Sequence, residues 1–242
     1  MVEKQKLIHS NVFRMRPETT IVCVLKTGGD FHFEDVLLLS SNLQKQWKGE
    51  GYLRTICLWD QAEKQIEFTT CTILPFPHPE WKGWWSKLNL FSPEMEKYRP
   101  FLFLDLDTAI VGDLTEVLPK EEDRDKFILL RDLYRPRRLA TGMMWIPARS
   151  EKVDKVWEYW IANNPLTLAA RYRGDNNIIE NATVPDLYFQ DYTSAISSFK
   201  PDKKWLMKVP EGIKVVCFHG KPRIFEAAKS VEWVKKYVDG TY

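Results

Sequence analysis

The stretch "FLFLDLDTAIVGDL", residues 101–114, decides the fold of this chain of 242 residues. Its first four residues are all apolar, which is typical of a strand buried on both faces in a parallel sheet. Asp105 and Asp107 follow the run, and carboxylates are rarely buried without a partner. We therefore expect both where the strand leaves the core. Ligands of α/β sheets bind at the carboxyl ends of strands, so this pair predicts a site for something cationic.

Apolar, strand-like runs alternate with helical patterns along the rest of the chain. After "IVCVL" (21–25) and a "KTGGD" turn, Val36, Leu39, Leu43 and Trp47 fall on one face of a predicted helix. The other predicted strands are 54–60, 101–104, 126–130, 142–146 and 214–218, and the other predicted helices are 81–91, 153–161 and 231–238. This alternation predicts one α/β domain over residues 1–242, with a mostly parallel, Rossmann-like central sheet flanked by helices.

Composition and charge are those of an ordinary globular protein. Hydrophobic residues make up 44% and charged residues 28%, and the net charge of +2 gives no basic field that points to nucleic acid. Cys23, Cys57 and Cys217 lie in apolar runs and no CxxC pattern occurs, which is typical of reduced, buried thiols. No secretory leader is recognisable, and no apolar stretch approaches the length of a transmembrane helix. We expect a soluble, cytoplasmic protein.

Two groups of residues carry chemistry that the sequence can indicate. In extended backbone, residues i and i+2 share a face, so Asp105 and Asp107 can offer two oxygen ligands to one Mn²⁺ or Mg²⁺. In "VVCFHGKPR" (215–223), His219 is a suitable third ligand, Gly220 would let a phosphate approach the backbone, and Lys221 supplies a positive charge. The alternatives are acids that cap the next turn and an ordinary loop histidine.

An ordered set of motifs resembles a known family. The segments are "GWWSKLNLF", "FLFLDLDTAIVGDL", "TGMMWIP", "GDNNIIE" and "FHGKP". Together they resemble bacterial nucleotide-sugar glycosyltransferases of the GT-A fold, closest to family 8 and its relatives, over about residues 20–225. The resemblance implies that Asp105, Asp107 and His219 hold Mn²⁺ on the diphosphate of a UDP-sugar, with Gly220 and Lys221 on the phosphates.

The resemblance also gives roles to the first strand and its turn. Those residues would cradle the nucleoside; they are Leu25, Lys26, Thr27, Gly28 and Gly29. Lys87 matches the basic residue of the family near the donor phosphate or sugar, although a solvated helix lysine is an equally good interpretation of the residue alone. Thr141 and Gly142 lie in the strand expected to border the sugar.

The segment "GDNNIIE" supplies the expected catalytic residues, Asp175 and Asn176. Relatives show an acid followed by glutamine here, so the shorter amide of Asn176 departs from the pattern, and a structural helix N-cap at Asp175 remains an alternative. Arginines 131, 135, 137 and 138 form a basic loop before the sugar-pocket strand. Such loops are usually just solvated; a functional one would favour an anionic acceptor, such as a phosphorylated saccharide, a lipid-linked carrier or a nucleic acid.

The function predicted from these motifs is metal-dependent transfer of a hexose from a UDP-sugar to an acceptor hydroxyl. Retention of configuration follows from the resemblance alone. One alternative is a phosphatase of the haloacid-dehalogenase type, because "FLFLDLDTAI" also fits its hydrophobic-D-x-D-x-T pattern, with Asp105 as nucleophile and Asp107 as acid/base. A second alternative is a non-catalytic protein that binds nucleotide sugars.

Overall fold

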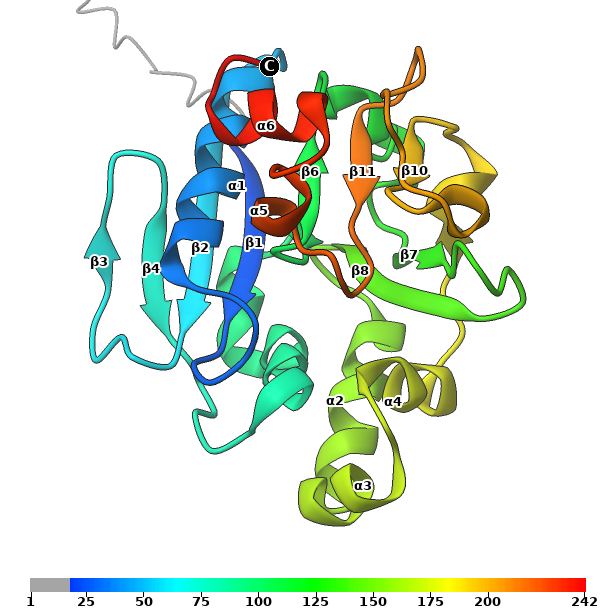
Figure 1. The fold of residues 1–242 in the computed structure, drawn as a ribbon. Helices are drawn as coiled ribbons and strands as arrows, with labels where there is room; N and C mark the ends of the chain where they lie inside the picture. The colour runs from blue at the N-terminus through cyan, green and yellow to red at the C-terminus, as the bar shows by residue number, and fades with distance from the viewer. Residues whose placement is uncertain (1–17) are drawn as a thin grey trace, which may run out of the picture.

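The computed structural model describes residues 18–242, and its centre is an eight-stranded sheet (Figure 1). In spatial order the strands are β3 (Ile66–Glu67), β4 (Thr72–Pro75), β2 (Tyr52–Trp59), β1 (Glu18–Leu25), β5 (Phe101–Leu104), β8 (Leu139–Ile146), β7 (Ile128–Arg131) and β9 (Leu187–Tyr188). The pairings leave only β3 and β8 running against the other strands of this sheet. The predicted mostly parallel α/β sheet is confirmed.

Strand β5 lies near the middle of the sheet and has both faces covered. Its side chains alternate, so Leu102 and Leu104 pack on one side and Phe101 and Phe103 on the other. All four are fully buried. A run of four apolar residues with no polar alternation is what such a position requires, which confirms the strand predicted at 101–104.

Helices cover the two faces of the sheet. The helices are α1 (Phe33–Gln46), α2 (Glu151–Ala162), α3 (Pro165–Arg171), α4 (Asp175–Ala182), α5 (Ile224–Ala227) and α6 (Glu232–Val238). Val36, Leu39 and Leu43 of α1 pack with Leu102 and Leu104, whereas α2 and α4 pack on the side of the phenylalanines. Figure 1 shows α1 across β1 and β2, and α2 and α4 beside β8.

A second, three-stranded sheet brings two distant parts of the chain together. It consists of β10 (Ile196–Ser198), β11 (Val215–Cys217) and β6 (Thr108–Ile110). In the antiparallel pairing of β6 with β11, Thr108 lies opposite Cys217. Because Asp107 directly precedes β6 and His219 closely follows β11, this sheet places the D-x-D segment beside the histidine segment.

The tryptophan-rich segment differs from its prediction. Residues Gly83–Phe91 form a 3₁₀ helix, η1, rather than the expected α-helix over 81–91. Five shorter 3₁₀ segments are η2 (Pro93–Tyr98), η3 (Leu114–Val117), η4 (Glu121–Asp123), η5 (Phe189–Asp191) and η6 (Pro201–Lys203). At the predicted helical spacing, Trp81 and Leu88 are buried, but Trp84 is 66% exposed, so this part of the prediction is wrong. The spacing also does not separate a 3₁₀ from an α-helix over nine residues.

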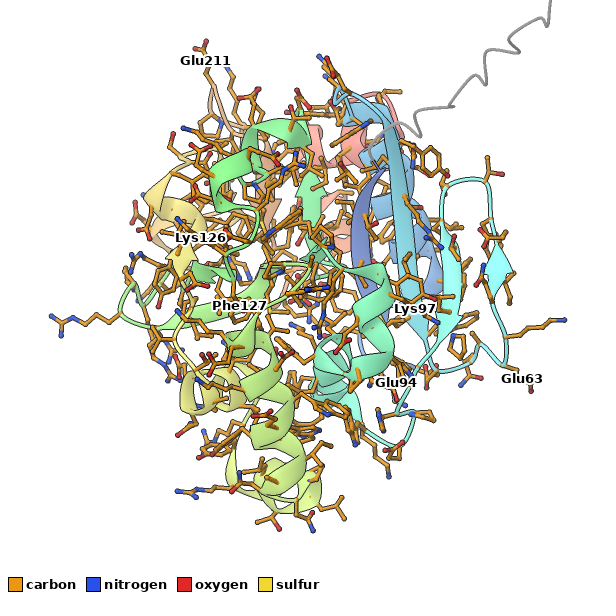
Figure 2. All side chains as sticks on the ribbon, turned by 180° about the vertical axis from the view of Figure 1, so that it is seen from behind. Glu63, Glu94, Lys97, Lys126, Phe127 and Glu211 are labelled. Carbon is orange, nitrogen blue, oxygen red and sulfur yellow. The ribbon has the colours of Figure 1, made fainter. Side chains whose placement is uncertain are left out.

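The interior and the surface are clearly separated. Phe127 is fully buried and lies near the centre of the view from behind, whereas Glu63 and Glu211 project from outer loops (Figure 2). Within residues 18–242, no helix has the length and apolar character needed to cross a membrane.

Candidate functional site

A cavity of about 1040 Å³ opens where several strands of the sheet end. Its walls come from the turn after β1, from the two aspartates after β5, from β8 and from the segment after β11. The predicted site residues that line it are Lys26, Thr27, Gly28, Gly29, Lys87, Asp105, Asp107, Thr141, Gly142, Asp175, Asn176 and His219. Leu25, Gly220 and Lys221 are not among the lining residues.

Lys87, Asp105, Asp175 and Thr141 form the floor of this cavity, and Lys87 contacts the other three. Its Nζ lies 2.9 Å and 3.0 Å from the two carboxylate oxygens of Asp105 and 3.3 Å from Oδ2 of Asp175. The ammonium also donates to the backbone oxygen and the hydroxyl of Thr141, at 3.4 Å and 3.3 Å. Only 12% of the Lys87 side chain is exposed. The interpretation of Lys87 as a solvated helix lysine is therefore wrong.

The charges of this cluster shift the pKa values of its members. Burial by itself lowers the pKa of Lys87, but the nearby charges of Asp105 and Asp175 outweigh it and hold the pKa above the ordinary lysine value. Burial raises the pKa of Asp105 to about 6 against the opposing charge of Lys87, and the like charges of Asp107 and Asp175 add to the rise. The lysine therefore stays cationic, and the cavity floor concentrates carboxylates around it.

Thr141 connects the two expected catalytic residues to this cluster. Its hydroxyl lies 2.5 Å from Oδ2 of Asp175, to which it donates, and 2.6 Å from Oδ1 of Asn176. Asp175 is the first residue of α4 and follows Gly174, which is the N-cap. The Asp175 carboxylate thus faces the cavity instead of capping its helix, and Asn176 stands beside it.

Arg223 holds the second aspartate of the D-x-D pair. Its Nη1 donates to Oδ2 of Asp107 at 2.5 Å, and its Nη2 donates to Oδ2 of Asp30 at 3.1 Å. The guanidinium stacks over the ring of Phe31 with 4.5 Å to the centroid. Burial raises the pKa of Asp107, although the charges of Arg223 and Lys87 oppose the rise. Each D-x-D carboxylate therefore has its own protein cation.

His219 follows β11 beside the D-x-D segment, where the backbone nitrogen of Phe218 donates to the backbone oxygen of Asp107 at 2.8 Å. The ammonium of Lys200 donates to the backbone oxygens of His219 and of Lys221, and the ring of Tyr134 meets the imidazole edge-on with centroids 5.5 Å apart. Burial lowers the pKa of His219, so the imidazole is neutral at pH 7. Its Nε2 is buried and has no hydrogen-bond partner.

The chemistry of these side chains fits a divalent cation, although they are not gathered around one point. Two carboxylates and a neutral imidazole with an unpartnered nitrogen form a suitable ligand set for Mn²⁺. Among residues 18–242, however, no group of three or more His, Cys, Asp or Glu side chains converges closely enough to hold a metal. A cation bound by Asp105 and Asp107 must share these carboxylates with Lys87 and Arg223.

Asp60 organises the turn expected to hold the nucleoside. Its Oδ1 accepts from both the backbone nitrogen and the hydroxyl of Thr27 at 2.8 Å, and its Oδ2 lies 3.3 Å from Nζ of Lys26. The same ammonium donates to the backbone oxygen of Pro79 at 2.9 Å. Asp60 follows β2 directly, just as Asp105 follows β5. The sequence therefore offers the same signal for Asp60 as for Asp105, an acid at the end of a predicted strand, but only Asp105 is predicted from it.

Other predicted residues have different partners. The side chain of Lys221 is 64% exposed, and its Nζ lies 3.2 Å from Oε1 of Glu226 in α5. Lys221 therefore lies just before α5 and not in the cavity wall. In the basic loop, Arg131 and Arg138 are paired with Asp191 and Glu180. Arg135 is exposed and lines the cavity. Of the four arginines of this loop, Arg135 alone lines the cavity.

Comparisons with known proteins find similarity only at the level of structure. No family model matches the sequence, and no curated protein matches it. Among solved structures, the galactosyltransferase LgtC, solved with donor and acceptor sugar analogues, superposes with a TM-score of 0.59 at 10% identity, covering 92% of this chain and 96% of that chain. The chain has the GT-A fold.

Two further structures support this GT-A assignment. The bifunctional glycosyltransferase WbbM gives a TM-score of 0.59 at 9% identity, and the match covers 95% of this chain and 50% of WbbM. The glycosyltransferase GlyE of Streptococcus pneumoniae TIGR4 gives 0.56 at 12% identity, covering 92% of this chain and 60% of GlyE. At these identities the similarity is one of fold, so the role of the GT-A cavity has to be argued from its own residues.

Proposed function

We propose that the protein is a glycosyltransferase that moves a hexose from a UDP-sugar to an acceptor hydroxyl. The observation that carries the proposal is the arrangement at the cavity floor, where Lys87 binds Asp105 and Asp175 together beneath a cavity of about 1040 Å³. The carboxylates accept hydrogen bonds from sugar hydroxyls, and Lys87 together with Arg223, beside Asp107, supplies positive charge toward phosphates.

In such a reaction, different residues of the cavity would bind the leaving diphosphate, orient the sugar and hold the metal ion. Cleavage of the donor leaves negative charge on a diphosphate, and Lys87 and Arg223, which lie beside the two aspartates, are two of the cavity-lining cations that would meet it. Asp175 and Asn176, aligned by Thr141, offer an acceptor and an amide to sugar hydroxyls and so orient the anomeric carbon. A divalent cation on Asp105, Asp107 and His219 would add Lewis-acid stabilisation of the leaving group.

Finer parts of the proposal rest on the resemblance of the sequence motifs. Mn²⁺, UDP as the nucleotide, membership of family 8 and retention of configuration belong to this group. The cytoplasmic location and the single domain over residues 1–242 likewise stay predictions.

Donor hydrolysis tests the proposal without knowledge of the acceptor. Purified protein is incubated with a panel of nucleotide sugars, with Mn²⁺ or with EDTA, and release of the nucleotide is followed. We expect one donor to be cleaved in a metal-dependent way, and the substitution Asp107→Asn to slow this cleavage about 100-fold. The matched control is Asp239→Asn, because Asp239 follows α6, forms an ion pair with Lys235 and does not line the cavity.

Two other outcomes would overturn the proposal. If no donor is cleaved and a generic phosphomonoester is hydrolysed with Mg²⁺, the chain is a phosphatase with Asp105 as nucleophile. If UDP binds in a metal-dependent way and no donor is cleaved, the chain is a non-catalytic binding protein.

A further inference from the structure

Trp81, just before η1, and Trp84 and Trp85, in its first turn, differ in their surroundings. Trp81 stacks on His78 with centroids 4.6 Å apart, and Trp85 stacks on Trp160 at 5.5 Å. Trp84 lies between them in sequence but is 66% exposed. Among the described residues, the indole of Trp84 has no stacking or hydrogen-bond partner. The side chain lines the cavity. Packing in the core therefore explains Trp81 and Trp85 but not Trp84.

The geometry of a 3₁₀ helix places Trp84 directly over the cavity floor. With three residues per turn, side chains at i and i+3 eclipse each other, so Trp84 and Lys87 project from the same side of η1. Lys87 is at the bottom, bound to Asp105 and Asp175 and 12% exposed. Trp84 is one turn nearer to solvent. A ligand that contacts its ring lies between the cavity floor and the mouth of the cavity.

From this position we infer that Trp84 is the stacking platform for the pyranose ring of a saccharide acceptor. The inference rests on the proposed function and names the acceptor class for the same site. A pyranose offers a flat face of C–H groups and a rim of hydroxyls, and the exposed face of an indole is apolar and electron-rich. Lys82 and Arg135 line the same cavity and supply donors for the hydroxyl rim.

The position distinguishes the acceptor from the donor. The donor phosphates need the buried cations, which lie at the cavity floor, and the acceptor must reach the donor from the solvent side. The cavity, at about 1040 Å³, slightly exceeds the range of roughly 300–1000 Å³ that is usual for a ligand pocket, which is consistent with a donor and an acceptor bound together.

Saturation-transfer NMR on the full chain tests this inference. The probes are UDP with Mg²⁺ and a mixture of methyl α- and β-glycosides of glucose, galactose and mannose. We expect at least one methyl pyranoside to receive saturation on its ring C–H protons. Trp84→Ala should weaken its binding about tenfold, and Trp84→Phe should largely preserve it. The matched control is Tyr52→Ala, which removes another aromatic ring that is 63% exposed and does not line this cavity.

The UDP signals in the same tube separate the two claims. UDP saturation that survives in Trp84→Ala while the pyranoside signal is lost supports the inference. Pyranoside signals that are equal in the wild type and in Trp84→Ala, or absent throughout while UDP binds, overturn the stacking platform alone. Absence of UDP signals in the wild type overturns the proposed function itself.

Discussion

Replacing Arg223 by glutamine should strengthen the binding of Mn²⁺ to the protein without nucleotide. In the structure the guanidinium donates to Asp107 at 2.5 Å, and the two side chains are only 20% and 16% exposed. A cation that takes Asp107 as a ligand must compete with this charge-assisted hydrogen bond. Glutamine keeps much of the side-chain volume and removes the charge.

The size of the effect follows from that one bond. A hydrogen bond between charged groups contributes about 1.5–3 kcal/mol, and partial exposure places this pair toward the lower end. If Mn²⁺ no longer has to displace a hydrogen bond worth about 2 kcal/mol, its affinity for the protein rises roughly 30-fold. The favourable contact of Arg223 with Asp30 is lost as well, but Asp30 is not among the expected metal ligands.

Electron paramagnetic resonance measures this affinity directly, because free Mn²⁺ gives a sharp signal that disappears on binding. The matched control is Arg138→Gln, which removes an arginine with an equally short contact to Glu180 that does not line the cavity. We expect the control to bind Mn²⁺ like the wild type. Equal or weaker binding by Arg223→Gln would show that Arg223 does not compete for the metal ligands, and the account of the D-x-D pair would be refuted.

Three other predictions concern the stability and reactivity of the chain. Lys87→Met leaves two carboxylates at the cavity floor without their cation, so the free energy of unfolding in urea should fall by about 3 kcal/mol; an unchanged midpoint contradicts the ion pairing described. Phe103→Ala should lower the free energy of unfolding by about 4 kcal/mol because the ring is fully buried. The control Leu166→Ala, at a side chain that is 82% exposed, should change it by less than about 0.5 kcal/mol. Equal effects of the two substitutions would contradict the burial of Phe103 in the core. Burial raises the pKa of Cys71 to about 11, so only about one thiol in a thousand is ionised at pH 8, and a disulfide reagent should label it only after unfolding; rapid labelling of Cys71 in the native protein contradicts its burial.

The central strands of the large sheet could be predicted from the sequence because their residues are buried. "FLFL" has no polar residue, as is typical of a strand covered on both faces, so the sequence predicts the strand at 101–104 with the bounds that the structure shows. The same reasoning located Asp105 at the strand end. It also located parts of β1, β2 and β8, whose apolar runs face the core.

The partners of the charged residues could not be predicted in this way. Arg223 reaches Asp107 across 116 positions of the sequence and Asp30 across 193. Those pairings depend on the small sheet, whose strands β6 and β10 have three residues each and carry too little pattern to be recognised. The role of Lys87 stayed undecided for the same reason, because spacing along a helix does not show which distant carboxylates it meets.

A crystal structure with UDP and Mn²⁺ tests the central claim most directly. The claim is that the cavity between the turn after β1 and the D-x-D pair binds a nucleoside diphosphate. We predict that the uridine binds at the turn after β1, where Thr27 donates to Asp60. The diphosphate should lie near Arg223, and the Mn²⁺ should bind Asp105 and Asp107. A nucleotide bound anywhere else, or a cavity that stays empty at saturating UDP, would contradict the account.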